Sequence, residues 1–110
     1  MSANGRPPSV DTRWLARLSE EIIDPTLPII DAHHHLWEVA GYRYLIDDLL
    51  ADLDSGHHVE ATVFVQCGYG YRSEGPEHLR PVGETQRIAA IGDEAARARL
   101  LDRLRAGACA

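Results

Sequence analysis

The sequence contains no lysine, and all 11 of its positively charged side chains are arginines. Against them stand 17 acidic residues, so the formal net charge is −6. This balance gives no basic field that would attract nucleic acid or an anionic membrane surface. We therefore expect neither nucleic acid nor a membrane as a partner, and we give the exclusive use of arginine no functional weight.

Cysteine is also scarce, since Cys67 and Cys109 are the only two and lie far apart in the sequence. Such spacing is not that of a disulfide-stapled secreted domain, so we expect reduced thiols. The first ten residues lack the apolar run of a signal peptide or a spanning helix. A cytoplasmic location is expected.

What the chain does contain is an ordinary globular composition, with 45% apolar and 25% charged residues in 110. Residues 1–10 hold Gly5 and two prolines, and we expect them to form a flexible arm. Asp11 or Thr12 can then cap a helix that runs to Asp24, where Pro25 ends it. Residues 11–110 are expected to form the folded part.

The most informative stretch is Pro28–Trp37, in which two isoleucines are followed by Asp31-Ala32-His33-His34-His35. The β-branched run predicts a buried strand that delivers polar side chains at its carboxyl end. With a side-chain period of two, Asp31, His33 and His35 share one face, and His34 points to the other.

The pattern after this strand predicts a parallel strand–helix–strand unit. A loop is expected over residues 38–44, a helix over 48–54 ended by Gly56, and a second strand over 61–66 that is apolar on both faces. Helical patterns then cover residues 84–91 and 93–105, with Gly92 as the expected break. A third strand is expected to begin near residues 106–110.

His33 and His35 suit a divalent metal, because imidazole binds zinc, manganese, iron or cobalt and both rings reach one centre. The alternative is a solvated strand end that makes only hydrogen bonds. Asp31 either holds an imidazole tautomer or accepts backbone N–H groups. His34 is expected to be packed or bonded to a loop.

Other candidates follow the second strand. Tyr71 and Arg72 could hold a substrate carboxylate, or could be a surface tyrosine and a salt-bridging arginine. Cys67 is interpreted as a small buried side chain, and His78 as a solvated loop residue with a possible substrate contact. The helix dipole alone explains Glu84. His57 and His58 lie at the end of the sheet opposite the histidine cluster.

Several stretches of the sequence resemble those of a known protein family. Pro28–Glu38 is similar to the first strand of the amidohydrolase-related, metal-dependent TIM-barrel hydrolases, in particular the branch of the 2-pyrone-4,6-dicarboxylate lactonases and sugar lactonases. Further similar stretches are Tyr44–Leu50, Ala61–Cys67, Tyr71–Glu77 and Pro81–Thr85. The resemblance extends from about Trp14 onward, and its motifs are specific to the branch rather than to a substrate.

The resemblance implies an α/β fold in which residues 11–110 form the first two strand–helix units of a (β/α)8 barrel, behind an N-terminal helix. It implies that His33 and His35 ligate zinc or, alternatively, manganese. A whole barrel needs on the order of 250 residues, and the later ligands and the general base have no counterpart here. The metal site of this chain is therefore expected to be incomplete.

The expected function is that of an amino-terminal fragment of a hydrolase. Such an enzyme attacks a lactone, ester or amide carbonyl of a small carboxylated substrate with metal- or base-activated water, and Tyr71 with Arg72 would orient the acid. The isolated chain is expected to be inactive. The alternatives are an assembly module that self-associates through open sheet edges, and a metal-sequestering chain.

Overall fold

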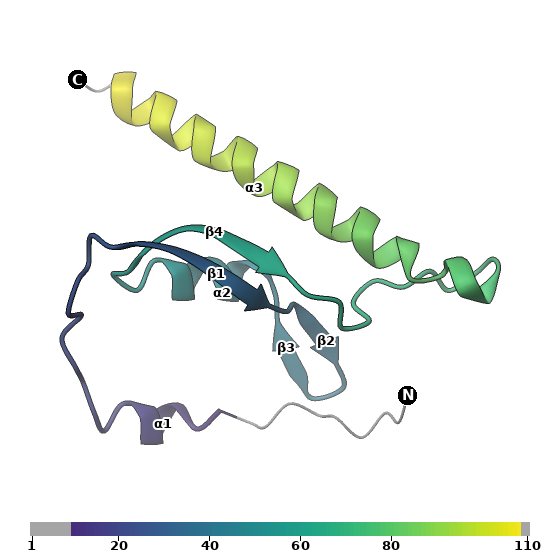
Figure 1. Cartoon of the computed structure of the whole chain (residues 1–110), viewed down its shortest axis with the longest axis horizontal. Coiled ribbons are helices and arrows are strands. Elements are labelled where there is room, and N and C mark those ends of the chain that lie inside the picture. The colour runs from purple at the N-terminus through teal and green to yellow at the C-terminus, as the bar shows by residue number, and fades with distance from the viewer. Residues whose placement is uncertain (1–9, 109–110) are drawn as a thin grey trace. The chain divides into compact units, whose positions relative to one another are not determined.

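The computed structural model describes residues 10–108 of the chain, with side chains as far as Ala98. Helices and small β-sheets are mixed along it, as the sequence predicts (Figure 1). The chain divides into two compact units, Met1–Cys67 and Gly68–Ala110. The flexible arm expected at residues 1–10 lies outside the described residues except for Val10, which is exposed.

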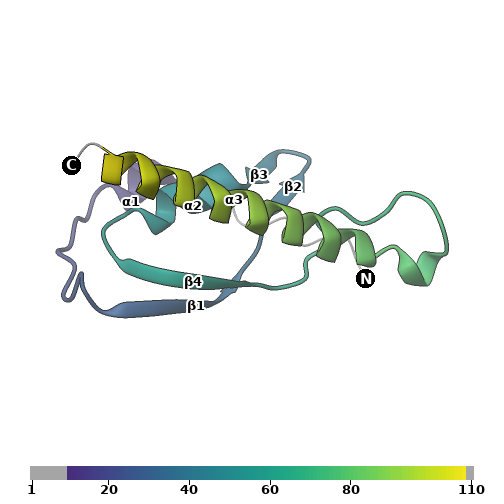
Figure 2. The same cartoon turned by 90° about the horizontal axis from the view of Figure 1, so that it is seen from above.

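The first unit is built on two parallel strands, β1 (Pro28–His34) and β4 (His58–Phe64). They lie side by side and run in the same direction in both views of the ribbon (Figures 1 and 2). Between them in sequence comes α2 (Ile46–Leu53). The predicted parallel strand–helix–strand order is confirmed, although the second strand begins three residues earlier than the pattern indicated.

Two irregularities interrupt the pairing of β1 with β4. The first lies between Ile29 and Ile30, and the second between Asp31 and His34. At the second, β1 advances by three residues while β4 advances by two, which places one extra residue in β1 beside the histidines. Such bulges re-aim side chains at strand ends, so a strict two-residue alternation does not hold through residues 31–35.

The loop expected over residues 38–44 is instead a β-hairpin. Strand β2 (Trp37–Val39) pairs antiparallel with β3 (Tyr42–Tyr44) across a two-residue turn. Gly41 occupies that turn with φ of 77°, a left-handed conformation that favours glycine. The prediction was wrong because aromatic residues flanking a tight glycine turn are themselves a hairpin signal.

The first helix is much shorter than predicted. Helix α1 covers only Thr12–Leu15, with Asp11 accepting hydrogen bonds from the backbone of Arg13 and Trp14. The predicted cap is therefore correct and the predicted length is wrong. Trp14, Leu15 and Leu18 are exposed, so no packed face supports further turns, and helical periodicity alone is marginal in water.

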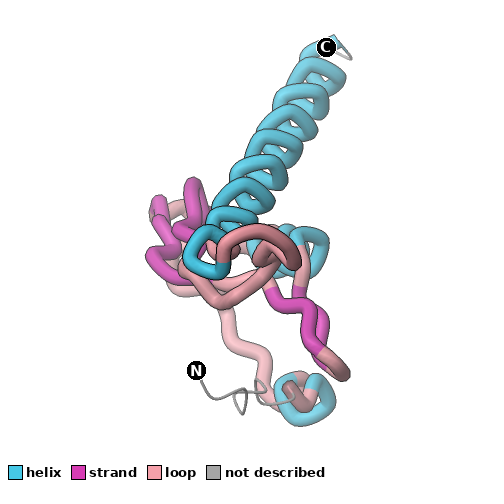
Figure 3. The backbone as a smooth tube through the Cα atoms, turned by 90° about the vertical axis from the view of Figure 1, so that its right-hand side faces the viewer, coloured by secondary structure: helices cyan, strands magenta, loops and turns pink. Residues whose placement is uncertain are grey.

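In the second unit, the short 3₁₀ helix η1 (Glu77–Leu79) precedes the long helix α3 (Val82–Ala108). Figure 3 shows α3 as an unbroken cyan coil. The break predicted at Gly92 is wrong. The third strand predicted to begin near residues 106–110 is wrong as far as Ala108, where α3 still continues, and residues 109 and 110 lie outside the described part of the chain. A glycine inside a helix costs about 1 kcal/mol relative to alanine, which lowers helix stability without ending the helix.

The described residues form little core. Among residues 10–98, only Leu36 and Leu49 are buried hydrophobic side chains, while Ile30 and Val63 on the parallel strands are 66% and 48% exposed. The first strand was predicted to be buried and the second to be apolar on both faces, but neither strand contains a buried residue in the structure.

One hydrogen bond ties the hairpin to α2. The Tyr44 hydroxyl donates to Oδ2 of Asp52 at 2.5 Å. Burial raises the pKa of Tyr44 above its ordinary value of 10, and the Asp52 carboxylate adds to this effect. The contact therefore stabilises the fold below about pH 10. Its contribution is lost as the pH rises further, because the unfolded chain releases the phenolic proton more readily.

We expect Tyr44→Phe to lower the free energy of unfolding by about 1 kcal/mol, the net value of one hydrogen bond. It should also remove the last-ionising tyrosine from an alkaline absorbance titration. Urea unfolding and tyrosinate absorbance measure the two effects. Tyr42→Phe, in the same strand, is the matched control, and loss of the late ionisation in that variant instead would contradict the assignment.

Candidate functional site

The imidazoles of His33 and His35 come together at the carboxyl end of β1. Their Nε2 atoms lie 3.0 Å apart, and the rings meet edge to face at 81°. Nδ1 of His35 lies 2.8 Å from the carbonyl oxygen of Val65, just past β4. A carbonyl only accepts, so in the neutral ring Nδ1 carries the proton and Nε2 of His35 holds the lone pair.

The separation of 3.0 Å is that of a direct hydrogen bond between the rings, in which Nε2 of His33 donates to the lone pair on Nε2 of His35. Two nitrogens about 2.0–2.1 Å from one tetrahedral zinc ion stand roughly 3.3–3.4 Å apart. The pair would therefore open by a few tenths of an ångström to hold such an ion. A carbonyl that accepts from the second ring nitrogen is the usual outer partner of a metal-binding histidine, and Val65 supplies it to His35.

Across the described part of the chain, no group of three or more His, Cys, Asp or Glu side chains is arranged to hold a metal ion. His33 and His35 are thus a pair without a third protein ligand among those residues. A catalytic zinc site uses about three protein ligands and a water. The role of the pair as metal ligands stays a prediction.

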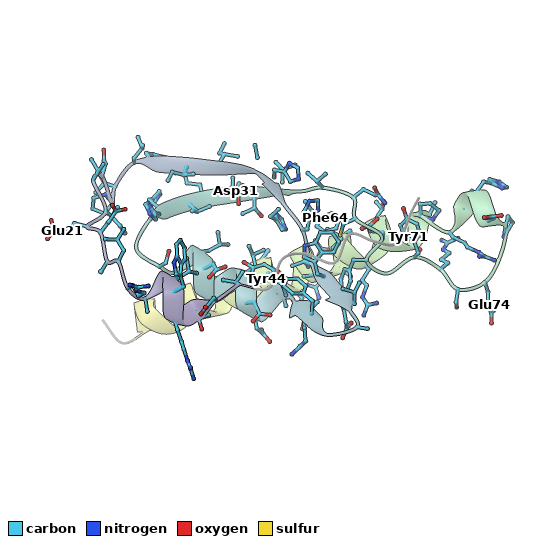
Figure 4. The ribbon with its side chains drawn as sticks, turned by 90° about the horizontal axis from the view of Figure 1, so that it is seen from below. Glu21, Asp31, Tyr44, Phe64, Tyr71 and Glu74 are labelled. Carbon is cyan, nitrogen blue, oxygen red and sulfur yellow. The ribbon has the colours of Figure 1, made fainter. Side chains whose placement is uncertain are left out.

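Of the two interpretations of Asp31, the structure favours a backbone role. Its Oδ1 atom accepts the N–H of His33 at 3.1 Å. This bond falls at the bulge in β1, so the carboxylate supports the irregular backbone that precedes the imidazole pair. Figure 4 labels Asp31 on its strand and Phe64 at the end of β4.

His34 is packed, as predicted. Its ring meets that of Phe64 edge to face with centroids 5.6 Å apart, and its Nδ1 atom is buried without a hydrogen-bond partner. Burial lowers the pKa of His34 below its ordinary value of 6.5, and the Asp31 carboxylate opposes this in part. The side chain is set apart from its two neighbours by this apolar packing.

The remaining candidates of the first unit take structural positions. His58 pairs with Pro28 at the start of the sheet, and its Nε2 atom lies 3.3 Å from Oε1 of Glu60. The Cys67 thiol donates to the carbonyl oxygen of Leu36 at 3.2 Å. Cys67 was predicted to be a small buried side chain, and it is half-buried in the structure.

Tyr71 and Arg72 belong to the second unit, in the loop that follows Gly68. Nη2 of Arg72 donates to Oε1 of Gln86 at 2.8 Å, and its backbone N–H donates to the carbonyl of Arg80 at 3.0 Å. Tyr71 is exposed beside it. His78 lies exposed in η1.

Sequence reasoning missed the residue that organises this loop. Glu84 is only 3% exposed, and its Oε1 atom accepts the N–H groups of both Gly68 and Tyr69, at 3.0 and 2.9 Å. The expectation that the helix dipole alone explains Glu84 is therefore wrong, because the dipole does not account for these two bonds. A carboxylate in the first turn after a glycine-rich loop is the signal that could have indicated it.

Comparison with known proteins finds no match, whether among protein-family models, curated proteins or solved structures. The resemblance to the amidohydrolase-related hydrolases therefore stays a prediction from the motifs. Within the described residues, no helix has both the length and the apolar character needed to cross a membrane.

The environment of His34 predicts an acid-sensitive contribution to stability. Because its folded-state pKa is lowered, the unfolded chain takes up a proton first as the pH falls below about 6.5. Stability should then decline until the folded-state pKa is passed. Nuclear magnetic resonance titration of the ring should give a midpoint below 6.5, and His34→Gln should weaken the acid dependence of urea unfolding. A midpoint at or above 6.5 would contradict the assignment to burial.

Proposed function

We propose that this chain supplies the metal-binding first strand of an amidohydrolase-type hydrolase, and that β1, α2 and β4 are the first units of a (β/α)8 barrel. The observation that carries the proposal is the convergence of the His33 and His35 Nε2 atoms at the carboxyl end of a parallel strand. Barrel enzymes of this type place their chemistry at the carboxyl ends of the strands. The similarity of Pro28–Glu38 to the first strand of that family also supports the proposal.

The chain's own residues would act by orienting the metal ligands. Val65 fixes the tautomer and plane of His35 through its carbonyl, and Asp31 supports the backbone of His33. A bound zinc or manganese ion would polarise a lactone, ester or amide carbonyl and lower the pKa of water. Two imidazoles leave such a shell incomplete, so further ligands would come from outside the described residues.

The proposed substrate is a small carboxylated molecule. The planar guanidinium of Arg72 can hold a carboxylate through two parallel hydrogen bonds, and Tyr71 is exposed next to it in the chain. The support for this role is that Gln86 accepts a hydrogen bond from the Arg72 guanidinium, which limits its orientations, while the Arg80 carbonyl holds the Arg72 backbone.

The metal role is tested by calorimetric titration of the full chain with Zn²⁺ at neutral pH. His33→Gln and His35→Gln should each weaken binding by about ten-fold or more, because losing a ligand should cost at least as much as losing an outer partner of one. His34→Gln is the matched control, because that ring lies between the pair in sequence but packs on Phe64. It should change the affinity less than about two-fold.

Equal weakening in all three variants would reject the paired site and favour general histidine binding. Without its remaining ligands, the 110-residue chain should hydrolyse simple lactones no faster than zinc in buffer. Turnover that depends on His33 would show that the shell is completed in solution.

A second candidate function, assembly with other copies of the chain, is favoured by the open sheet. Among the described strands, β1 and β4 pair only with each other, so each has one unpaired edge. Ile30 and Val63 add exposed apolar surface to the same two strands. Open edges of this kind invite pairing with another chain.

Assembly predicts that the sedimentation coefficient rises with protein concentration. Ile30→Lys and Val63→Lys should both shift the chain toward monomer, since charged side chains on an open strand oppose edge pairing. Ile23→Lys is the control, because Ile23 is fully exposed outside any strand. Equal dissociation by the control would indicate nonspecific hydrophobic aggregation.

A further inference from the structure

The carboxylate of Glu84, in the first turn of α3, is buried within the second unit. Glu84 is almost fully shielded from water, and its Oε1 atom accepts two consecutive backbone N–H groups from the loop, those of Gly68 and Tyr69. A buried carboxylate is costly unless hydrogen bonds compensate it, and bonds to an ionised acceptor are roughly twice as strong as neutral ones. The contact therefore fixes the path of the loop backbone at Gly68 and Tyr69.

The loop also lies directly against the helix. A Cβ atom built on Gly83 would stand 2.7 Å from the carbonyl oxygen of Gly70 and 2.8 Å from the backbone nitrogen of Arg72. Gly70 has φ of 83°, a conformation that favours glycine. The loop backbone thus approaches the helix closely at Gly83, the residue next to Glu84.

Side chains from the next turn of α3 complete the contact. The guanidinium of Arg87 lies 4.7 Å from the centroid of the Tyr69 ring, and Gln86 accepts from Arg72 at 2.8 Å. Residues 83, 84, 86 and 87 therefore hold residues 68–72, which we call the clamped loop. Figure 4 labels Tyr71 on this loop. Arg72 is the last of the held residues.

We infer that Glu84 is a positioning residue whose carboxylate holds the clamped loop so that Arg72 presents its guanidinium to an anionic substrate group. The inference rests on the proposed carboxylate-binding role of Tyr71 and Arg72. Glu84 acts through the backbone of Gly68 and Tyr69, and the bond from Gln86 then fixes the Arg72 side chain.

An electrostatic role and a positioning role of Glu84 predict opposite effects of the Glu84→Gln substitution on anion binding. Glu84→Gln removes a negative charge from the unit that holds Arg72, so a purely electrostatic role predicts tighter anion binding. A positioning role predicts weaker binding, because a neutral amide oxygen is a poorer acceptor for the two loop N–H groups. Glu84→Ala removes both bonds and should weaken binding further.

The test uses the full isotope-labelled chain and isophthalate, a small dicarboxylate, followed by nuclear magnetic resonance at the Arg72 side chain. Glu84→Gln should lower the isophthalate affinity about five-fold and Glu84→Ala more, with helix content by circular dichroism unchanged. Glu77→Gln is the matched control, since Glu77 is exposed in η1 of the same unit. It should leave the affinity unchanged or raise it.

Equal or tighter binding by Glu84→Gln, or equal weakening by Glu77→Gln, would overturn the inference. If the wild-type chain does not bind isophthalate at all, the proposed substrate role of Arg72 fails instead. Hydrogen exchange then decides the role of Glu84. Faster exchange at Gly68 and Tyr69 and a shifted Arg72 side-chain signal in Glu84→Gln support positioning, and unchanged exchange and signal reject it.

Discussion

The parallel pairing of β1 with β4 is the constraint on which the candidate metal site depends. It brings the backbone just past Phe64 alongside the end of β1, so that the Val65 carbonyl accepts from His35 and the Val65 N–H donates to the His34 carbonyl. The same pairing places Phe64 against the His34 ring. Neighbouring histidines are thereby given different environments, with two rings facing each other and one ring packed.

The second unit is organised by polar contacts to a helix rather than by a sheet. Its loop carries glycines at 68, 70 and 75 with positive φ, and such a backbone has many accessible conformations in the unfolded chain. Selecting one of them costs conformational entropy, which the charge-assisted bonds to Glu84 and the Arg87 contact with Tyr69 offset. A buried carboxylate thus holds the backbone of this loop in one conformation.

Both proposed functions would cover apolar strand surface that is exposed to water in the described residues. Leu36 and Leu49 are buried, whereas the strand residues Ile30 and Val63 remain open to water. A hydrolase of the proposed type would cover those strands with further strand–helix units, and an assembly module would cover them with another copy. In either case additional apolar burial would stabilise the parallel pair.

The sequence by itself determined the parallel strand–helix–strand order and the Asp11 cap, because these follow from local periodicity and side-chain chemistry. It also predicted that His33 and His35 meet, although the bulge in β1 means that they do not do so through the strict alternation from which the prediction was made. It did not determine the hairpin at residues 37–44, the length of α1 or the continuity of α3 through Gly92. The length of α1 depends on whether its periodic face finds something to pack against, whereas the hairpin follows from a turn signal that was misread and α3 continues because one glycine costs too little to end a helix. Only the tertiary structure decided that Val65 orients His35 and that Glu84 holds the clamped loop, since each contact joins groups 15 or more residues apart whose approach no local pattern encodes.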